Sequence, residues 1–240
     1  LLAPRNYWLQ PAGALLAILL AAGTYGAIRS LLGRIGTTRK ASGEIVAVEH
    51  PAHDITTVHC RLDSGWQGHR PGQFAFVTFD DREGAHPFTI ASADHGDRTI
   101  SFQIKALGDY TNHLSVNLKP GQAVRVEGPY GCFELRRCDP TARQIWVAGG
   151  IGVTPFLSWL ESLQADPASA PIAELHYCTR DQATDAFVPR LQALCASLPR
   201  VHLHVHGARQ GAVLEVASLG ASKGSEIWFC GPAGLAEVLR

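Results

Sequence analysis

Three glycines within four residues follow an apolar run near the middle of the chain. The run 145–148 has the composition of a buried parallel strand. Gly149-Gly150-Ile151-Gly152 comes at its end, and Thr154 and Pro155 then open a segment whose apolar residues recur at helical spacing. Thr is a favourable N-cap, and Pro is tolerated at the first helical position. A strand, a glycine turn and a helix N-terminus direct backbone amides and the helix dipole at one point, which favours an anion such as a pyrophosphate.

The spacing of these glycines differs from Gly-x-Gly-x-x-Gly, so the stretch is not the usual dinucleotide-binding fingerprint. A tight strand–helix turn without a ligand therefore remains an alternative interpretation of this stretch alone.

Four further motifs stand in a fixed order around the glycine turn. They are His86-Pro87-Phe88-Thr89, Gly108-Asp109-Tyr110-Thr111, Gly128-Pro129-Tyr130-Gly131 and Phe229-Cys230-Gly231-Pro232. Together with the glycine turn, this set resembles the ferredoxin–NADP reductase superfamily. The His-Pro-Phe-Thr form, followed by Gly-Asp-aromatic-Thr, is most similar to the membrane ferric reductase and NADPH oxidase branch. The resemblance covers residues 43–240.

The resemblance implies an FAD site on the strand that carries His86, Pro87, Phe88 and Thr89. Phe88 would pack along the flavin, and the Thr89 hydroxyl would reach flavin N5, where it can donate or accept a hydrogen bond. Thr89 is therefore a predicted catalytic residue. His86 stands where much of the superfamily has Arg, and a largely neutral His is a weaker phosphate ligand. The alternative is an ordinary barrel strand with Phe88 in the core.

The motif at 108–111 precedes a predicted helix. In the resembled family this turn offers helix N-terminal amides and a hydroxyl to the FAD pyrophosphate, so Gly108 and Thr111 are predicted contacts. Lys105, just upstream, could add positive charge. The alternative is that Asp109 simply caps the helix.

The glycine turn is the expected site of the nicotinamide coenzyme, with Gly149, Gly150, Ile151, Gly152, Thr154 and Pro155 as its contacts. Thr179 and Arg180 come just after the predicted strand 172–178, at the carboxyl edge where adenosine moieties lie. Arg suits a ribose 2′-phosphate, so we expect NADPH, with NADH possible. The alternative is a solvated loop arginine.

Cys230, Gly231 and Pro232 end the last predicted strand. The resemblance places this Cys beside nicotinamide C4, close to flavin N5, and makes it the second predicted catalytic residue. A buried structural Cys is the alternative.

Composition excludes other classes of function. The chain has 21 basic and 21 acidic residues, without the basic excess of a nucleic-acid-binding protein. Its six cysteines form no CxxC pair, so neither a zinc site nor an iron–sulfur cluster is predicted, and they are expected to be reduced. His202, His204 and His206 alternate on one strand and share a face, but we predict a solvated face and no metal site.

The elements that would position these residues fall into two groups. Six short runs punctuated by turn residues predict an antiparallel FAD-binding β-barrel over 41–140, with a helix at 109–118. The runs are 44–49, 55–62, 73–79, 87–92, 99–106 and 122–127. Alternating strands and helices then predict a doubly wound parallel-sheet NAD(P)-binding domain over 141–240, which is incomplete at its C-terminus. Its strands are 145–148, 172–178, 201–205 and 227–230, and its helices are 155–164, 185–197 and 232–240.

An apolar stretch at 11–28 precedes both groups, within a predicted helix-and-linker segment at 1–40. Its length is at the short end for a transmembrane helix; a signal peptide and a buried soluble helix are the alternatives. Arg29, Arg34, Arg39 and Lys40 follow the stretch and only Arg5 precedes it, which predicts a cytoplasmic location for the catalytic domains. Residues 33–43 are expected to form a polar linker. Because the chain lacks Met, we expect a fragment of a longer protein.

The expected function is a membrane-tethered NAD(P)H:flavin oxidoreductase, which passes a hydride to FAD and then single electrons to an acceptor. The resembled branch implies a haem acceptor in an upstream part outside this chain, although the sequence leaves the final acceptor unknown. The alternatives are a flavin reductase component that feeds a separate oxygenase or other redox partner, and a flavin-binding scaffold without turnover.

Overall fold

The computed structural model describes residues 7–32 and 39–239. The chain divides into two compact units, residues 1–38 and 39–240. The predicted linker residues 33–38, Arg5, Arg34 and Arg240 lie outside the described residues.

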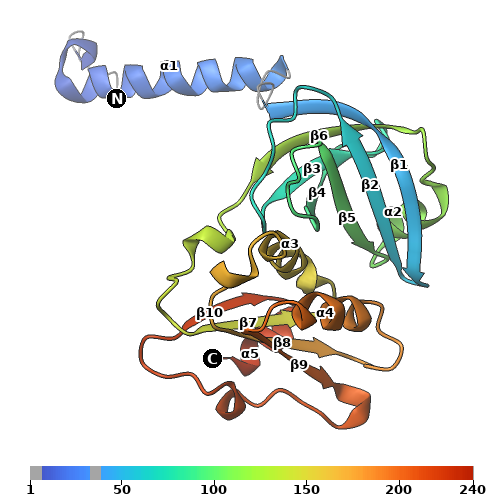
Figure 1. Ribbon diagram of the computed structural model, residues 1–240. Coiled ribbons are helices and arrows are strands. Elements are labelled where there is room, and N and C mark those ends of the chain that lie inside the picture. Colours follow the sequence, from blue (N-terminus) through green and yellow to red (C-terminus); the bar gives the residue numbers. More distant parts are fainter. Residues whose placement is uncertain (1–6, 33–38, 240) are drawn as a thin grey trace. The chain divides into compact units, whose positions relative to one another are not determined.

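The first unit contains a short 3₁₀ turn (Tyr7–Leu9) and one long helix, α1 (Pro11–Leu31) (Figure 1). Helix α1 has 21 residues with a mean hydropathy of 1.7, and only 6% of its most apolar window is buried. Length and composition suit a membrane span, but an N-terminal signal sequence has the same properties. The predicted helix is therefore confirmed, and its placement in a membrane stays a prediction.

The second unit begins with a six-stranded antiparallel sheet in the order β4-β3-β6-β1-β2-β5. The bridge between Ile90 and Phe102 joins the segment after β4 to β5, and this contact curls the sheet into the predicted barrel. Helix α2 lies beside the barrel (Figure 1), and its Leu114 and the residue just after it, Leu118, are buried in the barrel core. The elements of this part are β1 (Lys40–Ala52), β2 (Ile55–Leu62), β3 (Phe74–Thr78), β4 (His86–Thr89), β5 (Thr99–Lys105), α2 (Asp109–Asn117) and β6 (Ala123–Tyr130).

Strand β1 is longer than the sequence indicates. It starts at Lys40, inside the predicted linker, because residues Lys40 to Glu44 pair with Glu127 to Ala123 of β6. Ladder hydrogen bonds satisfy the backbone there, so the polar and glycine-containing segment 40–43 is strand and not linker.

The remainder of the unit is a four-stranded parallel sheet in the order β10-β7-β8-β9. Trp146 and Ala148 of β7 pack into the core that α3 and α4 form on one face, whereas Ile145 and Val147 pack with Leu214 on the other. Both faces are covered, as a doubly wound sheet requires. Its elements are β7 (Gln144–Gly149), α3 (Thr154–Leu163), β8 (Ala173–Thr179), α4 (Phe187–Ala196), β9 (Val201–Gly207), β10 (Glu226–Cys230) and α5 (Ala233–Val238). The domain boundary at residue 140 stays a prediction.

Candidate functional site

The glycine turn joins β7 to α3 through a 3₁₀ turn at Gly150–Val153. Helix α3 therefore begins at Thr154, and Thr154 is not its N-cap, because that position belongs to Val153. The buried Thr154 hydroxyl donates instead to the Ile151 carbonyl oxygen at 3.0 Å. Pro155 is also buried, so neither residue presents its side chain at the surface of the turn.

The glycines of this turn serve different purposes. A Cβ at Gly152 would lie 2.3 Å from the Cys230 carbonyl oxygen, so this glycine lets the β7–α3 turn pack against the end of β10. Gly150 has a φ of +52°, a left-handed conformation that favours glycine, and a Cβ there would meet nothing within 4 Å. Gly152 therefore supports packing within the protein, whereas Gly150 borders open space.

That space is a cavity of about 920 Å³ at the carboxyl ends of the parallel strands. It is lined by the glycine turn, by the ends of β8 and β10, and by residues from the β1–β2 hairpin and the end of β5 of the barrel. The predicted site residues in its lining are Lys105, Gly149, Gly150, Ile151, Gly152, Thr179, Arg180, Cys230, Gly231 and Pro232. Strand ends and their loops converge here as they do in open parallel sheets that bind ligands.

Two of the three cations in the lining are already paired. Lys105 Nζ lies 3.4 Å from Asp54 Oδ2, and Arg209 Nη1 lies 3.0 Å from Asp181 Oδ2. Arg180 is exposed, and its guanidinium has no hydrogen bond or ion pair with any residue that the structure describes. Arg180 is therefore the cation of this cavity that is available to an anionic ligand.

The Asp185 carboxylate holds the loop between β8 and α4 by accepting hydrogen bonds from three residues. The Tyr177 hydroxyl donates to the Asp185 carboxylate at 3.0 Å, and the Thr179 hydroxyl donates to the same carboxylate. The Phe187 amide also donates to Asp185, at 2.8 Å, and this bond fixes the start of α4. The hydroxyl of the predicted contact Thr179 is thus already used to hold the loop.

Sequence reasoning missed Asp54, Asp181, Asp185 and Arg209. The sequence could have indicated Arg209 as a site residue, because it follows the parallel strand β9 at the same edge of the sheet as Arg180. Asp54 comes from a distant hairpin, and no local pattern predicts its proximity to the cavity.

Cys230 lies at the end of β10 and is half-buried. Burial raises the pKa of its thiol, so the sulfur is protonated and uncharged at neutral pH. A neutral thiol at this position can pack against an uncharged ring, and it is a poor nucleophile.

The motif on β4 lies on the barrel, outside the lining of this cavity. His86 stacks on Tyr110 of α2 with ring centroids 3.8 Å apart. Phe88 packs against the barrel core, with its ring 6.3 Å from that of Phe102, and Pro87 is exposed. Thr89 is partly exposed, and its hydroxyl has no hydrogen-bond partner among the described residues.

The start of α2 is closed by the Thr111 side chain. The Thr111 hydroxyl accepts from the Leu107 amide at 2.9 Å and from the Gly108 amide at 3.1 Å. Gly108 is the N-cap, so Asp109 does not cap the helix. The Tyr110 hydroxyl is buried without a partner among the described residues. Burial, together with Glu83 and Asp80, raises its pKa to about 12, so it remains a hydrogen-bond donor.

The alternating histidines of β9 stack against β8. The buried His176 ring contacts the rings of both His204 and His206, with centroids 4.7 and 5.3 Å away. His202 and His204 are both exposed, and His204 Nε2 contacts Glu174 at 2.6 Å. The described residues contain no group of three or more potential ligands arranged for a metal ion.

Residues 41–134 match the family model of an FAD-binding domain. One curated relative is the ferredoxin–NAD(P)⁺ reductase component of a naphthalene 1,2-dioxygenase system from Pseudomonas putida, which is 28% identical over 213 residues. A second, from a Ralstonia species, is the corresponding component of naphthalene 1,2-dioxygenase and salicylate 5-hydroxylase systems and is 30% identical over 214 residues. Each alignment covers 84% of this chain and less than two thirds of the relative, 63% and 64%.

The fold is similar to that of phthalate dioxygenase reductase, which is described as transferring electrons from pyridine nucleotides to a [2Fe–2S] centre. The TM-score is 0.69 at 22% identity, and the match covers 83% of this chain and 62% of that protein.

None of these three proteins is a ferric reductase or an NADPH oxidase, so the comparisons do not support the predicted branch. They support the wider superfamily, in which an antiparallel FAD-binding sheet is followed by a parallel NAD(P)-binding sheet. Residues 41–134 therefore match an FAD-binding domain, and the chain is similar over most of its length to FAD- and NAD(P)-binding reductases of the ferredoxin–NADP reductase superfamily.

Proposed function

We propose that this chain is the flavin- and nicotinamide-binding part of a reductase component, which oxidises NAD(P)H and supplies a separate redox partner such as an oxygenase component or its ferredoxin. The observation that carries the proposal is the 920 Å³ cavity, where the glycine turn, Arg180 and Cys230 face Lys105 of the FAD-binding barrel. The phosphate-binding turn and the flavin domain thus border one space.

The barrel residues fit an FAD site. The buried Tyr110 hydroxyl has no partner among the described residues, so it can donate to an oxygen-rich ligand, while the His86 ring that stacks on Tyr110 is held by the Glu83 carbonyl oxygen at 3.2 Å. The first amides of α2 have no intrahelical acceptors and suit a diphosphate. The free Thr89 hydroxyl suits an atom that alternates between donor and acceptor. When bound, FAD would accept two electrons and one proton as a hydride and release the electrons singly to the partner.

The coenzyme side has three tasks. Gly150 leaves space for a phosphate group next to backbone amides, and Arg180 offers a charge to a 2′-phosphate. Cys230, Gly231 and Pro232 line the cavity next to the glycine turn, where an uncharged thiol can pack against the nicotinamide. Together these residues would position the coenzyme and exclude water from the hydride transfer.

The curated relatives favour this partner over a haem in an upstream membrane part. The haem interpretation depended on the ferric reductase branch, and the relatives are reductase components of oxygenase systems. The other alternative, a flavin-binding scaffold without turnover, is distinguished from a reductase by the titration described next.

An anaerobic titration of the FAD-loaded chain with NADPH tests the proposal. Bleaching of the flavin absorbance with one equivalent of NADPH, and reoxidation by an added one-electron acceptor, are expected. Bound flavin that stays oxidised would support the scaffold, and a chain that retains no flavin would contradict the proposal as a whole.

A further inference from the structure

The loops that follow β8 and β9 are tied together at the edge of the 920 Å³ cavity. Thr179 and Gly207 are the last residues of the two strands that pair in register. Just beyond them, the backbone amide of Arg209 donates to the carbonyl oxygen of Arg180 at 2.9 Å. The backbone of Arg180, whose guanidinium has no described partner, is therefore held by the neighbouring loop.

The Asp181 carboxylate joins the same two loops through side chains. It accepts from Gln210 Nε2 at 2.8 Å and from Arg209 Nη1 at 3.0 Å, and within its own loop from the Ala183 amide at 3.1 Å. The bond from Gln210, followed by that from Arg209, holds the pKa of Asp181 below its usual range, so the carboxylate is ionised at neutral pH. Donors from the β9 loop thus occupy a negative charge that lines the cavity.

Gln210 bridges the loops with both polar atoms of its side-chain amide. The nitrogen donates to Asp181, and the oxygen accepts from the Gln182 amide at 3.2 Å. A Cβ at Gly207 would lie 2.2 Å from that oxygen, so glycine at the end of β9 leaves room for the bridge. Gln210 itself lies outside the cavity lining, which includes Asp181. Its side chain can therefore act on a ligand only through the residues that it holds.

The Gln210 bridge is the larger part of the connection. Among the described residues, Gln210 makes two of the three side-chain hydrogen bonds between the loops, and Arg209 makes the third. The Arg209 side chain is 66% exposed, so water and salt screen its ion pair with Asp181. Loss of that side chain would leave the bridge and the backbone bond to Arg180 in place.

We propose that Gln210 is a positioning residue that sets the affinity of the cavity for an adenosine 2′-phosphate. By joining the loops it keeps Arg180 at the cavity, and by occupying Asp181 it reduces the repulsion between that carboxylate and the phosphate. The inference rests on the proposed coenzyme site and goes beyond it, because it assigns coenzyme specificity to a residue outside the lining of that site.

Gln210→Ala tests the proposal, since it removes the bridge without changing a lining residue or the net charge. The probes are adenosine 2′,5′-bisphosphate, which carries the 2′-phosphate, and 5′-AMP, which lacks it. Isothermal titration should show threefold to tenfold weaker binding of the bisphosphate, at about 1.4 kcal/mol per factor of ten, and 5′-AMP should stay within twofold. In the FAD-loaded chain, KM for NADPH should rise by a similar factor while kcat stays within twofold.

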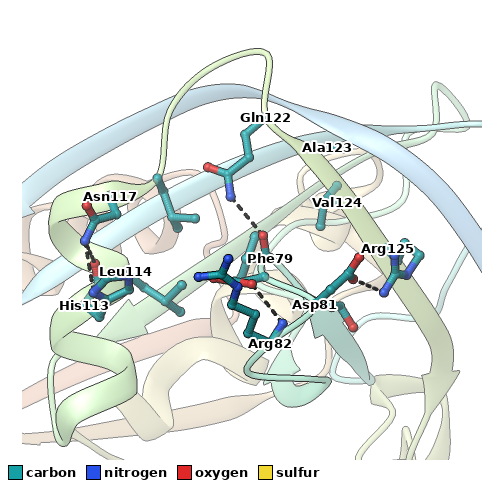
Figure 2. A pocket seen from close by; sticks show the side chains of 13 residues that line it. Phe79, Asp81, Arg82, His113, Leu114, Asn117, Gln122, Ala123, Val124 and Arg125 are labelled. Carbon is teal, nitrogen blue, oxygen red and sulfur yellow. Dashed lines mark hydrogen bonds and ion pairs between the residues drawn. The ribbon is translucent and has the colours of Figure 1, made fainter.

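Gln122→Ala is the matched control. Figure 2 shows Gln122 on the barrel, beside a second cavity of about 450 Å³ whose lining shares no residue with that of the first. Its side-chain amide also makes two bonds: the nitrogen donates to the Phe79 carbonyl at 2.9 Å, and the oxygen accepts from the Lys119 amide at 3.3 Å. Gln122→Ala should leave the dissociation constants of both probes within twofold.

A charge exchange provides a second test. Gln210→Glu places a carboxylate against Asp181 and should weaken the bisphosphate at least tenfold. Adding Asp181→Asn restores a donor opposite an acceptor and the original net charge, so most of the affinity should return.

Two results would overturn the inference: equal losses for the bisphosphate and 5′-AMP in Gln210→Ala, or wild-type affinity in both Gln210 variants. A wild type that binds the bisphosphate no more tightly than 5′-AMP would also overturn it. The anaerobic titration of the flavin tests the proposed function separately, so the two can fail independently.

Discussion

The backbone amide of Gly72 donates to the Oγ of Ser158 at 2.7 Å, and this bond joins a barrel turn to the middle of α3. Two further hydrogen bonds join the same helix to the barrel. Trp159 Nε1 donates to the Pro71 carbonyl at 3.1 Å, and Glu161 Oε2 accepts from the Ala93 amide at 3.0 Å. Helix α3 starts at the glycine turn, so one rigid element carries the coenzyme turn and holds it against the barrel.

Ser158→Ala should therefore disturb hydride transfer more than coenzyme binding. The substitution leaves the buried Gly72 amide without its acceptor, at a cost of about 1–3 kcal/mol in the free energy of unfolding. A loosened junction between α3 and the barrel should lower the rate of flavin reduction at saturating NADPH, with a smaller change in KM. Stopped-flow reduction and urea unfolding measure the two effects.

Ser162→Ala is the control, since among the described residues the Ser162 hydroxyl bonds only to the Trp159 carbonyl of its own helix. Equal effects of the two substitutions on the reduction rate would show that the bond to Gly72 has no positioning role.

Gly152→Ala and Gly150→Ala should separate packing from ligand binding. At Gly152 the new Cβ meets the Cys230 carbonyl, so we expect a large loss of stability and weaker coenzyme binding together. At Gly150 the Cβ meets no atom of the described residues within 4 Å, and only the left-handed backbone conformation is penalised, by about 1 kcal/mol. Gly150→Ala should therefore remain folded and still weaken NADPH, because its methyl group enters the cavity. Thermal unfolding and isothermal titration distinguish the variants, and wild-type NADPH affinity in Gly150→Ala would argue against a phosphate at this turn.

Thr89→Ala should keep FAD bound and slow its reduction by NADPH. The Thr89 hydroxyl has no described partner within the protein, so its loss should cost little stability. Thr89→Ser retains the hydroxyl and should restore most of the rate. Single-turnover reduction rates decide the question, and an unchanged rate in Thr89→Ala would exclude the hydroxyl from the reaction.

Both sheets could be predicted from the sequence because local patterns encode them. Alternating apolar residues and turn signals gave the six antiparallel strands, and the buried run before the glycine turn gave β7. The contacts that join the parts could not be predicted in this way. Nothing near Pro71 or Gly72 in sequence indicates a partner on α3, because these pairings depend on packing across more than 80 residues.

The candidate site was predictable to the same extent. Ends of parallel strands converge at one edge, and Gly150, Arg180 and Cys230, which follow three such strands, line one cavity; their roles stay predictions. The electron acceptor could not be predicted from the sequence. The His86–Thr89 and Gly108–Thr111 motifs are expected to form the flavin site, and neither motif indicates which molecule accepts the electrons. A branch prediction based on these motifs therefore exceeded what they encode.

Acidification should destabilise the chain through His176. Burial, and then the neighbouring His204 and His206, lower its pKa from 6.5 to about 4, so the folded state favours the neutral ring. The unfolded chain binds the proton first as pH falls, and the free energy of unfolding should decline below about pH 6.5 by up to about 1.4 kcal/mol per pH unit, levelling off near pH 4.

The charged and titratable groups that act on this ring are Glu174 on β8, His204 and His206 on β9, and Arg143 before β7. Urea unfolding from pH 7.5 to 4.5 should show a flatter pH dependence in His176→Gln. The exposed His202→Gln should follow the wild type, and a parallel curve for His176→Gln would assign the effect to other groups.

Arg180 should determine the choice of coenzyme. Its guanidinium is exposed in the cavity lining and has no described partner, whereas the nearby Arg209 is held by Asp181 at 3.0 Å. A charge-assisted hydrogen bond to the 2′-phosphate contributes about 1.5–3 kcal/mol, and NADH has only a hydroxyl at that position. Arg180→Ala should therefore lower kcat/KM for NADPH by roughly 10- to 150-fold, at 1.4 kcal/mol per factor of ten, and leave kcat/KM for NADH nearly unchanged.

Arg209→Ala, which removes a cation already paired, is the control and should alter the ratio of kcat/KM for NADPH to that for NADH far less. The ratio is measured for the wild type and both variants at constant ionic strength, since salt screens charge–phosphate contacts. A wild type that already prefers NADH, or a ratio that responds to Arg209 and not to Arg180, would refute the assignment.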